Sequence, residues 1–162
     1  MSLIAYMSVK GNSQGDIKGD CTQGGDKKDK MLVYACNHTV EIPTDTHTGL
    51  PTGKRIHHEF LVTKHKDQAS PKLFKACCTG ESCDVTLDYY RIAADGSEEK
   101  YFTVKLGQAI VASMREYTPT TFLPEDKPYH DMEDVCFAYP KILWNYATGN
   151  VEASDDWRGS RK

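Results

Sequence analysis

Apolar and polar residues alternate with a period of two along most of the chain, and this pattern predicts a protein built mainly of β-strands. Between residues 31 and 42 the even positions are largely apolar and the later odd positions are polar. This predicts a strand whose core face carries Leu32, Tyr34, Cys36, His38, Val40 and Ile42. Residues 54–66 predict a second strand, with an inner face made by Ile56, His58, Phe60 and Val62.

The second half of the chain continues the same alternation. In residues 83–89 and 102–106 the alternation predicts two further strands, each with one apolar face toward the core. Asp95-Gly96 between them favours a tight hairpin turn. A loop with three prolines follows at 118–128, and a last long strand begins near Met132. The apolar parity of that strand slips by one residue at Pro140, which predicts a bulge there. The polar tail, residues 153–162, is predicted to fray.

One short helix interrupts the strands. Ser70 is predicted as its N-cap and Pro71 as its first residue, where a missing N–H does no harm, and Gly80 is predicted to end it. Its narrow apolar face is predicted to consist of Leu73, Phe74 and Cys77. The recurrence of the strands suggests a sheet that closes on itself. We therefore expect residues 1–162 to form one mainly β domain, a compact β-barrel of two antiparallel sheets with one flanking α-helix.

The connection at residues 43–53 is longer than a hairpin needs. It is poor in charge and rich in threonine, with Leu50 and Pro51 near its tip. Long ordered loops on rigid sheets tend to carry function. The composition favours docking on another protein surface, and the alternative is a mobile surface excursion.

Composition and charge narrow the class of protein. The chain has 162 residues, 39% of them hydrophobic and 27% charged, which is typical of a soluble globular domain. A net charge of −3 and a mixed-sign run at 27–30 argue against nucleic-acid binding. The apolar run at residues 1–10 is too short to span a membrane and lacks the features of a signal peptide. We expect synthesis in the cytoplasm and no membrane insertion.

The six cysteines are predicted to be reduced and to act as small buried apolar groups: Cys21, Cys36, Cys77, Cys78, Cys83 and Cys136. A thiol enzyme that uses Cys36, with His38 two residues away on the same face, or Cys77 remains an alternative. We expect both Cys36 and His38 to face the core, which makes a packing role the stronger interpretation.

A metal or catalytic site is not predicted. His57 and His58 point to opposite faces of a strand, and the cysteines at 77, 78 and 83 do not have zinc-site spacing. A composite site of His58 with Cys77 is the remaining metal alternative. The sequence has no nucleotide-binding, hydrolase or metalloprotease motif. We expect no enzyme activity, no catalytic residues, no metal and no cofactor.

Several sequence segments resemble the haemolysin-coregulated protein (Hcp) family of bacterial type VI secretion systems. The resemblance runs from Leu3 to about Trp157. It is carried by Glu41–Asp45 (EIPTD), Thr52–His57 (TGKRIH), Phe60–Lys64 (FLVTK), Ala69–Ala76 (ASPKLFKA) and the pair Lys105-Leu106. The resemblance implies a secreted structural protein of a Gram-negative bacterium that leaves the cell without a signal peptide. It also implies a ring-shaped homo-hexamer, rings stacked into a tube, a tip spike protein, a contractile sheath and small effector proteins in the lumen.

The resemblance also suggests where contacts lie. The loop at 44–53 resembles the family's extended loop, so Thr46, His47, Leu50 and Pro51 are the expected ring-stacking residues. The half-apolar, half-polar outward face predicted for the strand at 31–42 suits a subunit interface and a lumen wall, with Asn37 and Thr39 facing the lumen. The cysteine content is high for the family, which leaves a redox role or a disulfide between subunits open. The main alternative function is a monomeric small-ligand-binding β-barrel.

Overall fold

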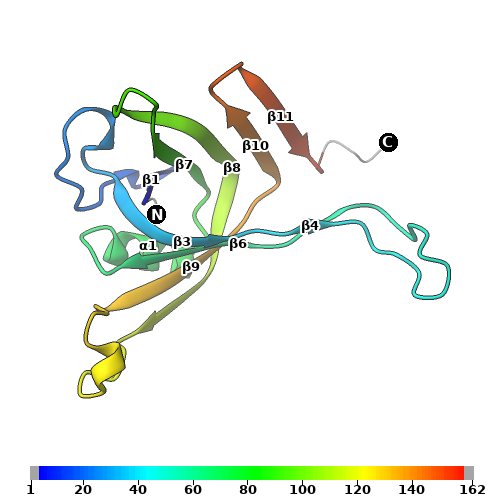
Figure 1. The fold of residues 1–162 in the computed structure, drawn as a ribbon. Helices are drawn as coiled ribbons and strands as arrows, with labels where there is room; N and C mark the ends of the chain where they lie inside the picture. The colour runs from blue at the N-terminus through cyan, green and yellow to red at the C-terminus, as the bar shows by residue number, and fades with distance from the viewer. Residues whose placement is uncertain (1–3, 159–162) are drawn as a thin grey trace.

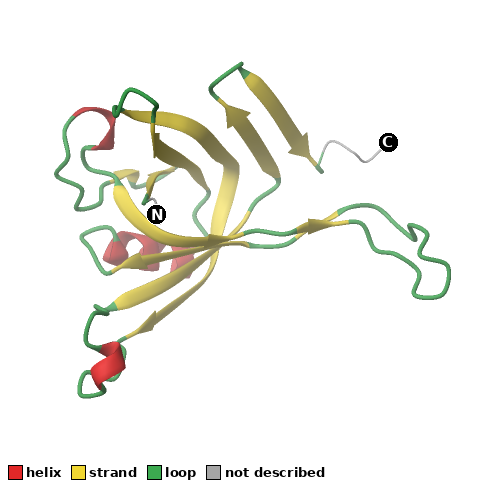
Figure 2. Ribbon diagram, viewed as in Figure 1, coloured by secondary structure: helices red, strands yellow, loops and turns green. Residues whose placement is uncertain are grey.

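The alternating segments form one antiparallel sheet that curls into a barrel (Figure 1). The structure, a computed structural model, describes residues 4–158. Its strands are β1 (Ala5–Gly11), β2 (Gly15–Ile17), β3 (Met31–Asn37), β4 (Val40–Glu41), β5 (Ile56–His57), β6 (Phe60–His65), β7 (Cys83–Ile92), β8 (Glu98–Tyr117), β9 (Met132–Ala138), β10 (Lys141–Tyr146) and β11 (Val151–Asp156). The helix α1 spans Ser70–Thr79, and short 3₁₀ turns lie at Gly25–Lys27 and Pro124–Asp126. Figure 2 shows the helical segments at the margins of the strand framework.

The barrel closes because β8 is long enough to pair at both of its ends. The strand order is β11-β10-β8-β7-β1-β3-β6-β9, and an additional β8–β9 pairing closes the ring, while β2 pairs with β1. Gln108 interrupts β8 with a φ of 52°, and its N–H donates to Asp84 Oδ1 at 3.0 Å. Before this kink β8 pairs with β7 and β10, and beyond it β8 pairs chiefly with β9. The mainly β barrel with one flanking helix is confirmed, but its wall is one continuous nine-stranded sheet, and the second sheet is only the two-stranded β4–β5 pair.

The core contains the inner faces of the strands and one side of α1. The predicted inner face of β7 is confirmed at Cys83, Val85 and Leu87, and the Asp95-Gly96 turn forms with Gly96 at a φ of 83°. Val104 and Leu106 are also buried as predicted. Other large side chains that fill the barrel are Met7, Met31, Val33, Phe60, Val62, Val135 and Phe137.

The predicted face of the strand at 31–42 is wrong. Met31 and Val33 are buried and Tyr34 is 39% exposed, because the register of β3 against β6 shifts between Val33 and Ala35 and the strand then leaves the barrel. In the partner segment Phe60 and Val62 are buried as predicted, but Ile56 and His58 are exposed. The pattern of 31–42 misled because both faces of this segment carry apolar residues.

The helix differs from its prediction at the start and on one face. Ala69 is the N-cap and Ser70 the first helical residue. The Asp67 carboxylate accepts from the N–H of Ala69 at 2.9 Å. Gly80 ends the helix in the left-handed region, as predicted. Leu73 is buried and Cys77 packs against the core, whereas Phe74 is 64% exposed.

A buried ionic cluster joins the end of β6 to α1 and β9. Lys64, fully buried, contacts Glu133 Oε1 at 2.5 Å and Asp67 Oδ1 at 2.8 Å. The Ser70 hydroxyl donates to Glu133 at 2.9 Å, and the N–H of Asp67 donates to the same hydroxyl at 3.0 Å. These bonds satisfy charges that burial would otherwise make costly.

The C-terminal region also departs from its prediction. Instead of one bulged strand, β9 ends at Ala138 and β10 begins at Lys141, with Pro140 between them. β9 pairs with β6 and with the second half of β8, whereas β10 pairs with β11 and with the first half of β8, which accounts for the change of parity. Residues 151–156, mostly in the predicted frayed tail, form β11 on the edge of β10. Residues 159–162 of that tail lie outside the described residues.

Candidate functional site

A long projection leaves the barrel where β3 and β6 end, and we call residues 38–58 the arm and residues 43–53 its tip (Figure 1). β4 and β5 pair in the arm through Val40 with His57 and Glu41 with Ile56. The His58 N–H donates to the Thr39 carbonyl at 3.0 Å. Farther out, Thr44 and Pro51 form an isolated bridge. The arm is therefore the outer part of the same hairpin whose inner part builds the barrel wall.

The tip is shaped by the Asp45 side chain. Its Oδ1 accepts from the backbone N–H groups of His47 and Thr48, each at 2.8 Å. The Gly49 N–H donates to the Asp45 carbonyl at 2.8 Å, and Gly49 has a φ of 68°. The bonds from Thr48 and His47 hold the pKa of Asp45 below its usual value. These local bonds organise a turn that has no hydrophobic core of its own.

The arm exposes apolar side chains on an otherwise polar segment. The exposed fractions are 45% for Val40, 55% for Ile42, 64% for Leu50 and 43% for Ile56. The predicted stacking residues Thr46, His47, Leu50 and Pro51 are all exposed. Apolar groups spread along a projecting segment suit contact with another protein chain.

The root of the arm is fastened to β11 by one carboxylate. Asp155 accepts from the Arg55 guanidinium, in a bond of 2.7 Å from Nη2 and a shorter one from Nε. It also lies 2.7 Å from His57 Nε2. The hydrogen bond from Arg55, with a smaller contribution from His57, lowers the pKa of Asp155. The His57 ring stacks on Trp157 with the ring centres 4.3 Å apart.

A second set of contacts fastens the other side of the root. The Tyr139 hydroxyl donates to the His58 carbonyl at 3.1 Å, so it accepts from Nε2–H of His38. The His38 ring also stacks on Phe60. Burial, with smaller contributions from His57 and His58, lowers the pKa of His38. The His58 ring lies 2.9 Å from Glu41 within the arm.

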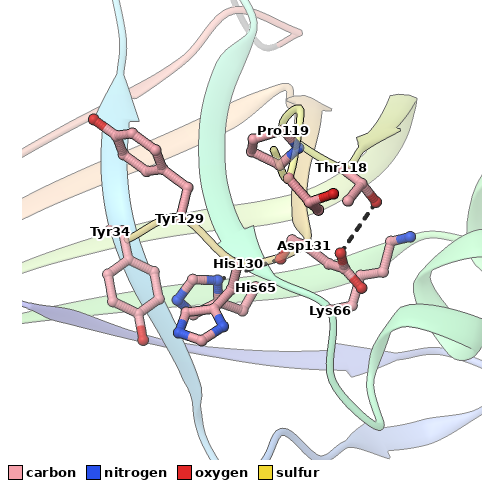
Figure 3. Close-up of a pocket in the computed structure, with 9 residues that line it drawn as sticks. Tyr34, His65, Lys66, Thr118, Pro119, Tyr129, His130 and Asp131 are labelled. Atoms are coloured by element: carbon pink, nitrogen blue, oxygen red, sulfur yellow. Dashed lines mark hydrogen bonds between the residues drawn. The ribbon is translucent and has the colours of Figure 1, made fainter. Parts of the chain in front are cut away.

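A pocket of about 630 Å³ lies at the opposite end of the β3–β6 hairpin (Figure 3). Tyr34 comes from β3, His65 from the end of β6, and the other wall comes from the β8–β9 connection. The rings of Tyr34 and His65 are 4.2 Å apart, and His65 meets His130 edge-on at 5.3 Å. Thr118 donates to the Asp131 carboxylate at 3.0 Å. The remaining lining residues are Lys66, Pro119, Thr121 and Tyr129.

Comparison with known proteins decides the family. Residues 6–146 match the family described as "Type VI secretion system effector, Hcp". The chain is 37% identical to the "Major exported protein" of Pseudomonas aeruginosa, with 98% of this chain and 97% of that protein covered. The chain belongs to the Hcp family.

Other relatives agree. Solved structures with the same fold include an Hcp protein at 26% identity, covering 96% of this chain and 98% of that chain, with a TM-score of 0.88. Another is Hcp1 from the E. coli EAEC 042 pathovar at 35% identity, covering 96% and 99%, with a TM-score of 0.84. A relative of 27% identity, YhhZ of Escherichia coli K12, is longer, and the match spans 95% of this chain and 38% of that protein.

Membership of the Hcp family confirms the resemblance seen in the sequence and makes this chain a type VI secretion tube protein. The alternative of a monomeric ligand-binding barrel has no support in these relatives. Among residues 4–158, no helix has the length and apolar content that crossing a membrane requires. The lumen-facing residues remain a prediction, although Asn37 and Thr39 are both exposed at the junction of barrel and arm.

The cysteines of this Hcp only partly match the buried role predicted for them. Cys21 and Cys83 are buried, Cys77 and Cys136 are half-buried, and Cys36 and Cys78 are exposed. All six are described and none is in a disulfide. The expectation that Cys36 faces the core is therefore wrong. Desolvation raises the pKa of the Cys36 thiol. It also raises the pKa of the Cys83 thiol, to about 11. Both shifts disfavour the reactive thiolate.

The chemical alternatives are not assembled by the fold. His38 contacts Tyr139 instead of the Cys36 thiol. Cys77 packs on the core from α1, while His58 pairs with Glu41 in the arm. In the part of the chain that the structure describes, no group of three or more His, Cys, Asp or Glu side chains could hold a metal ion.

Neither the root of the arm nor the pocket was predicted from the sequence. The root needs Arg55 and His57 to meet Asp155, which is one hundred residues away from Arg55 in the chain, and the pocket joins three separate segments. The sequence placed His57 on the face opposite to His58, but nothing in it indicated the partner of His57.

Proposed function

We propose that six copies of this Hcp assemble into a ring and that rings stack head to tail into the hollow inner tube of a type VI secretion system. The observation that carries the proposal is the arm, a hairpin that continues the barrel wall and carries exposed Val40, Ile42, Leu50 and Ile56 away from the body. A contact between a projection at one end and a surface elsewhere on the next copy is heterologous. It repeats along a stack without self-closure.

In this proposal the arm joins successive rings through Thr46, His47, Leu50 and Pro51. Asn37 and Thr39 face the lumen, which holds small effector proteins. Polar and threonine-rich surfaces support this assignment because many modest contacts allow a tube to release its load. A tip spike protein and a contractile sheath are the proposed partners outside the tube.

The protein acts as a structural element, without a catalytic residue, a metal or a cofactor. It is made in the cytoplasm of a Gram-negative bacterium and leaves the cell without a signal peptide. The support for export is the likeness to a major exported protein. The support for a structural role is the family.

Native mass spectrometry of the purified chain, together with negative-stain imaging across a range of concentrations, tests the proposal. We expect hexamers at low concentration and stacked rings at high concentration. A chain that stays monomeric at high concentration and forms no rings would contradict it.

A further inference from the structure

The tip and the aromatic pocket lie at opposite ends of one hairpin. From the pocket, β3 runs through the barrel wall into β4 and the tip, and β5 and β6 bring the chain back to His65 (Figure 1). Ten residues of extended chain separate Tyr34 from Thr44, a span of at most about 34 Å. If copies follow one another along this hairpin, the tip of one is carried toward the pocket end of the next.

The pocket has the shape and lining that a projecting turn needs. Its volume of about 630 Å³ is in the range of sites that enclose a ligand. The Tyr34, His65, His130 and Tyr129 rings line it, and Figure 3 shows these rings around one hollow. Tyr129 is 61% exposed, so its ring is available to a partner. Aromatic-lined grooves favour segments that contain proline, and the tip presents Leu50 followed by Pro51.

Charge also favours this occupant. The connection at 118–131 contains Glu125, Asp126 and Asp131 against Lys127, a net charge of −2 with histidine neutral. At the tip the Asp45 carboxylate already accepts local N–H groups, while the adjoining Lys54 is exposed. In the lining itself Lys66 balances Asp131, so the negative charge belongs to the connection that forms one wall. The tip thus offers two apolar residues to an aromatic-lined hollow, and the adjoining Lys54 offers a cation to the acidic connection.

We propose that the pocket formed by β3, β6 and the β8–β9 connection receives the tip of the arm of a second copy of this chain, with Leu50 and Pro51 seated against Tyr34 and Tyr129. The proposal rests on the proposed ring stacking and adds the surface that accepts the arm.

Preformed rings of two variants provide the test. A tip variant lacks Leu50 to Gly53 and keeps the pocket. A pocket variant carries Thr121→Arg and Tyr129→Ala, both at exposed positions, and keeps the tip. Phe74→Ala is the control, because Phe74 is an equally exposed aromatic residue outside the pocket.

Each variant alone is expected to form rings and not to stack, and the control is expected to stack as the unchanged protein does. Mixing the two variants is expected to give pairs of rings and nothing longer. In each pair the tips of the pocket variant enter the pockets of the tip variant. A third ring cannot join, because the pocket variant has no working pocket and the tip variant has no tip. Negative-stain imaging counts the rings in each stack.

Normal stacking by the pocket variant would overturn this inference while leaving the stacking role of the arm intact. Normal stacking by the tip variant would overturn the role of the arm as well, and an unchanged protein that forms no rings would overturn the proposed function. If the pocket variant forms no rings, a benzophenone amino acid placed at position 50 of the full chain replaces it. A cross-link to the pocket of another copy supports the inference, and one confined to a different surface refutes it.

Discussion

The barrel and the arm are parts of the same β3–β6 hairpin, but they are stabilised in different ways. In the barrel, Val33 and Val62 are buried within a sheet that pairs on both sides. In the arm, β4 and β5 pair only with each other, and the apolar residues there are exposed. An isolated two-stranded ribbon is marginally stable in water. We therefore expect the barrel to carry the stability of the fold, and the arm to become more ordered when it contacts another copy.

The largest expected effect tests the barrel half of this comparison. Lys64→Met leaves Glu133 and Asp67 without their buried cation, so the free energy of unfolding should fall by about 3–5 kcal/mol. Urea unfolding at one fixed protein concentration measures this loss.

The matched control for that variant is Lys66→Met. The Lys66–Glu116 pair is exposed and 3.3 Å apart, so its loss should cost less than about 1 kcal/mol. Equal effects at the two lysines would show that the buried cluster does not stabilise the barrel.

A smaller effect is expected where the arm meets the barrel. Asp155→Ala removes the acceptor for both Arg55 and His57. Because this carboxylate is partly exposed, the global loss should be about 1 kcal/mol. Hydrogen exchange of the arm amides should accelerate while that of the barrel stays nearly constant. Uniform acceleration over the whole chain would mean that arm and barrel unfold as one unit.

The pH dependence of stability should originate at the same root. The lowered pKa of His38 means that the unfolded chain binds the proton more readily than the folded chain. Stability should therefore fall as the pH drops through the ordinary histidine range near about 6.5. His38→Asn should flatten this dependence and His47→Asn at the tip should not, as measured by unfolding across that range.

Asp155 titrates in a separate, more acidic window. Its pKa is lowered, so its contribution to stability is present above the ordinary aspartate value and disappears as the pH falls through the folded value. The histidine effect should thus precede the carboxylate effect during acidification. A single transition in the aspartate range alone would contradict the assignment of His38.

The smallest effect on stability is expected at the tip. Asp45→Ala removes the acceptor for two N–H groups but touches no core, so the free energy of unfolding should stay nearly unchanged. Stacking of rings should nevertheless weaken, because the turn is no longer preorganised. Thr46→Ala is the control for the turn. A large loss of fold stability would show that the tip is part of the cooperative unit.

The sequence predicted those regions in which one local rule decides the structure. Alternation placed Cys83, Val85 and Leu87 correctly, and Gly80 marked the end of the helix. The predicted inner face of β3 was wrong because Tyr34 and Cys36, although apolar, lie outside the core. The strand at 151–156 was missed because its mostly polar residues are ordered by pairing with the edge of β10, which no local pattern reveals.

In the candidate site, too, the sequence predicted the features set by a local rule and missed those that depend on distant segments. The unusual length of the 43–53 connection and its composition were enough to identify the arm. The Arg55, His57 and Asp155 contacts and the pocket could not be predicted, because they depend on segments that only the closed barrel brings together. The family resemblance supplied the proposed assembly, which no motif in a single copy encodes.

The continuity of the arm with the barrel wall has a mechanical consequence. A pull on the tip is transmitted along β3 and β6, whose hydrogen bonds to β1 and β9 run across the direction of the strands. The force then acts in shear, so many bonds must fail together instead of opening one at a time. A filament joined through such arms would resist sudden axial acceleration far better than its modest contacts at rest suggest.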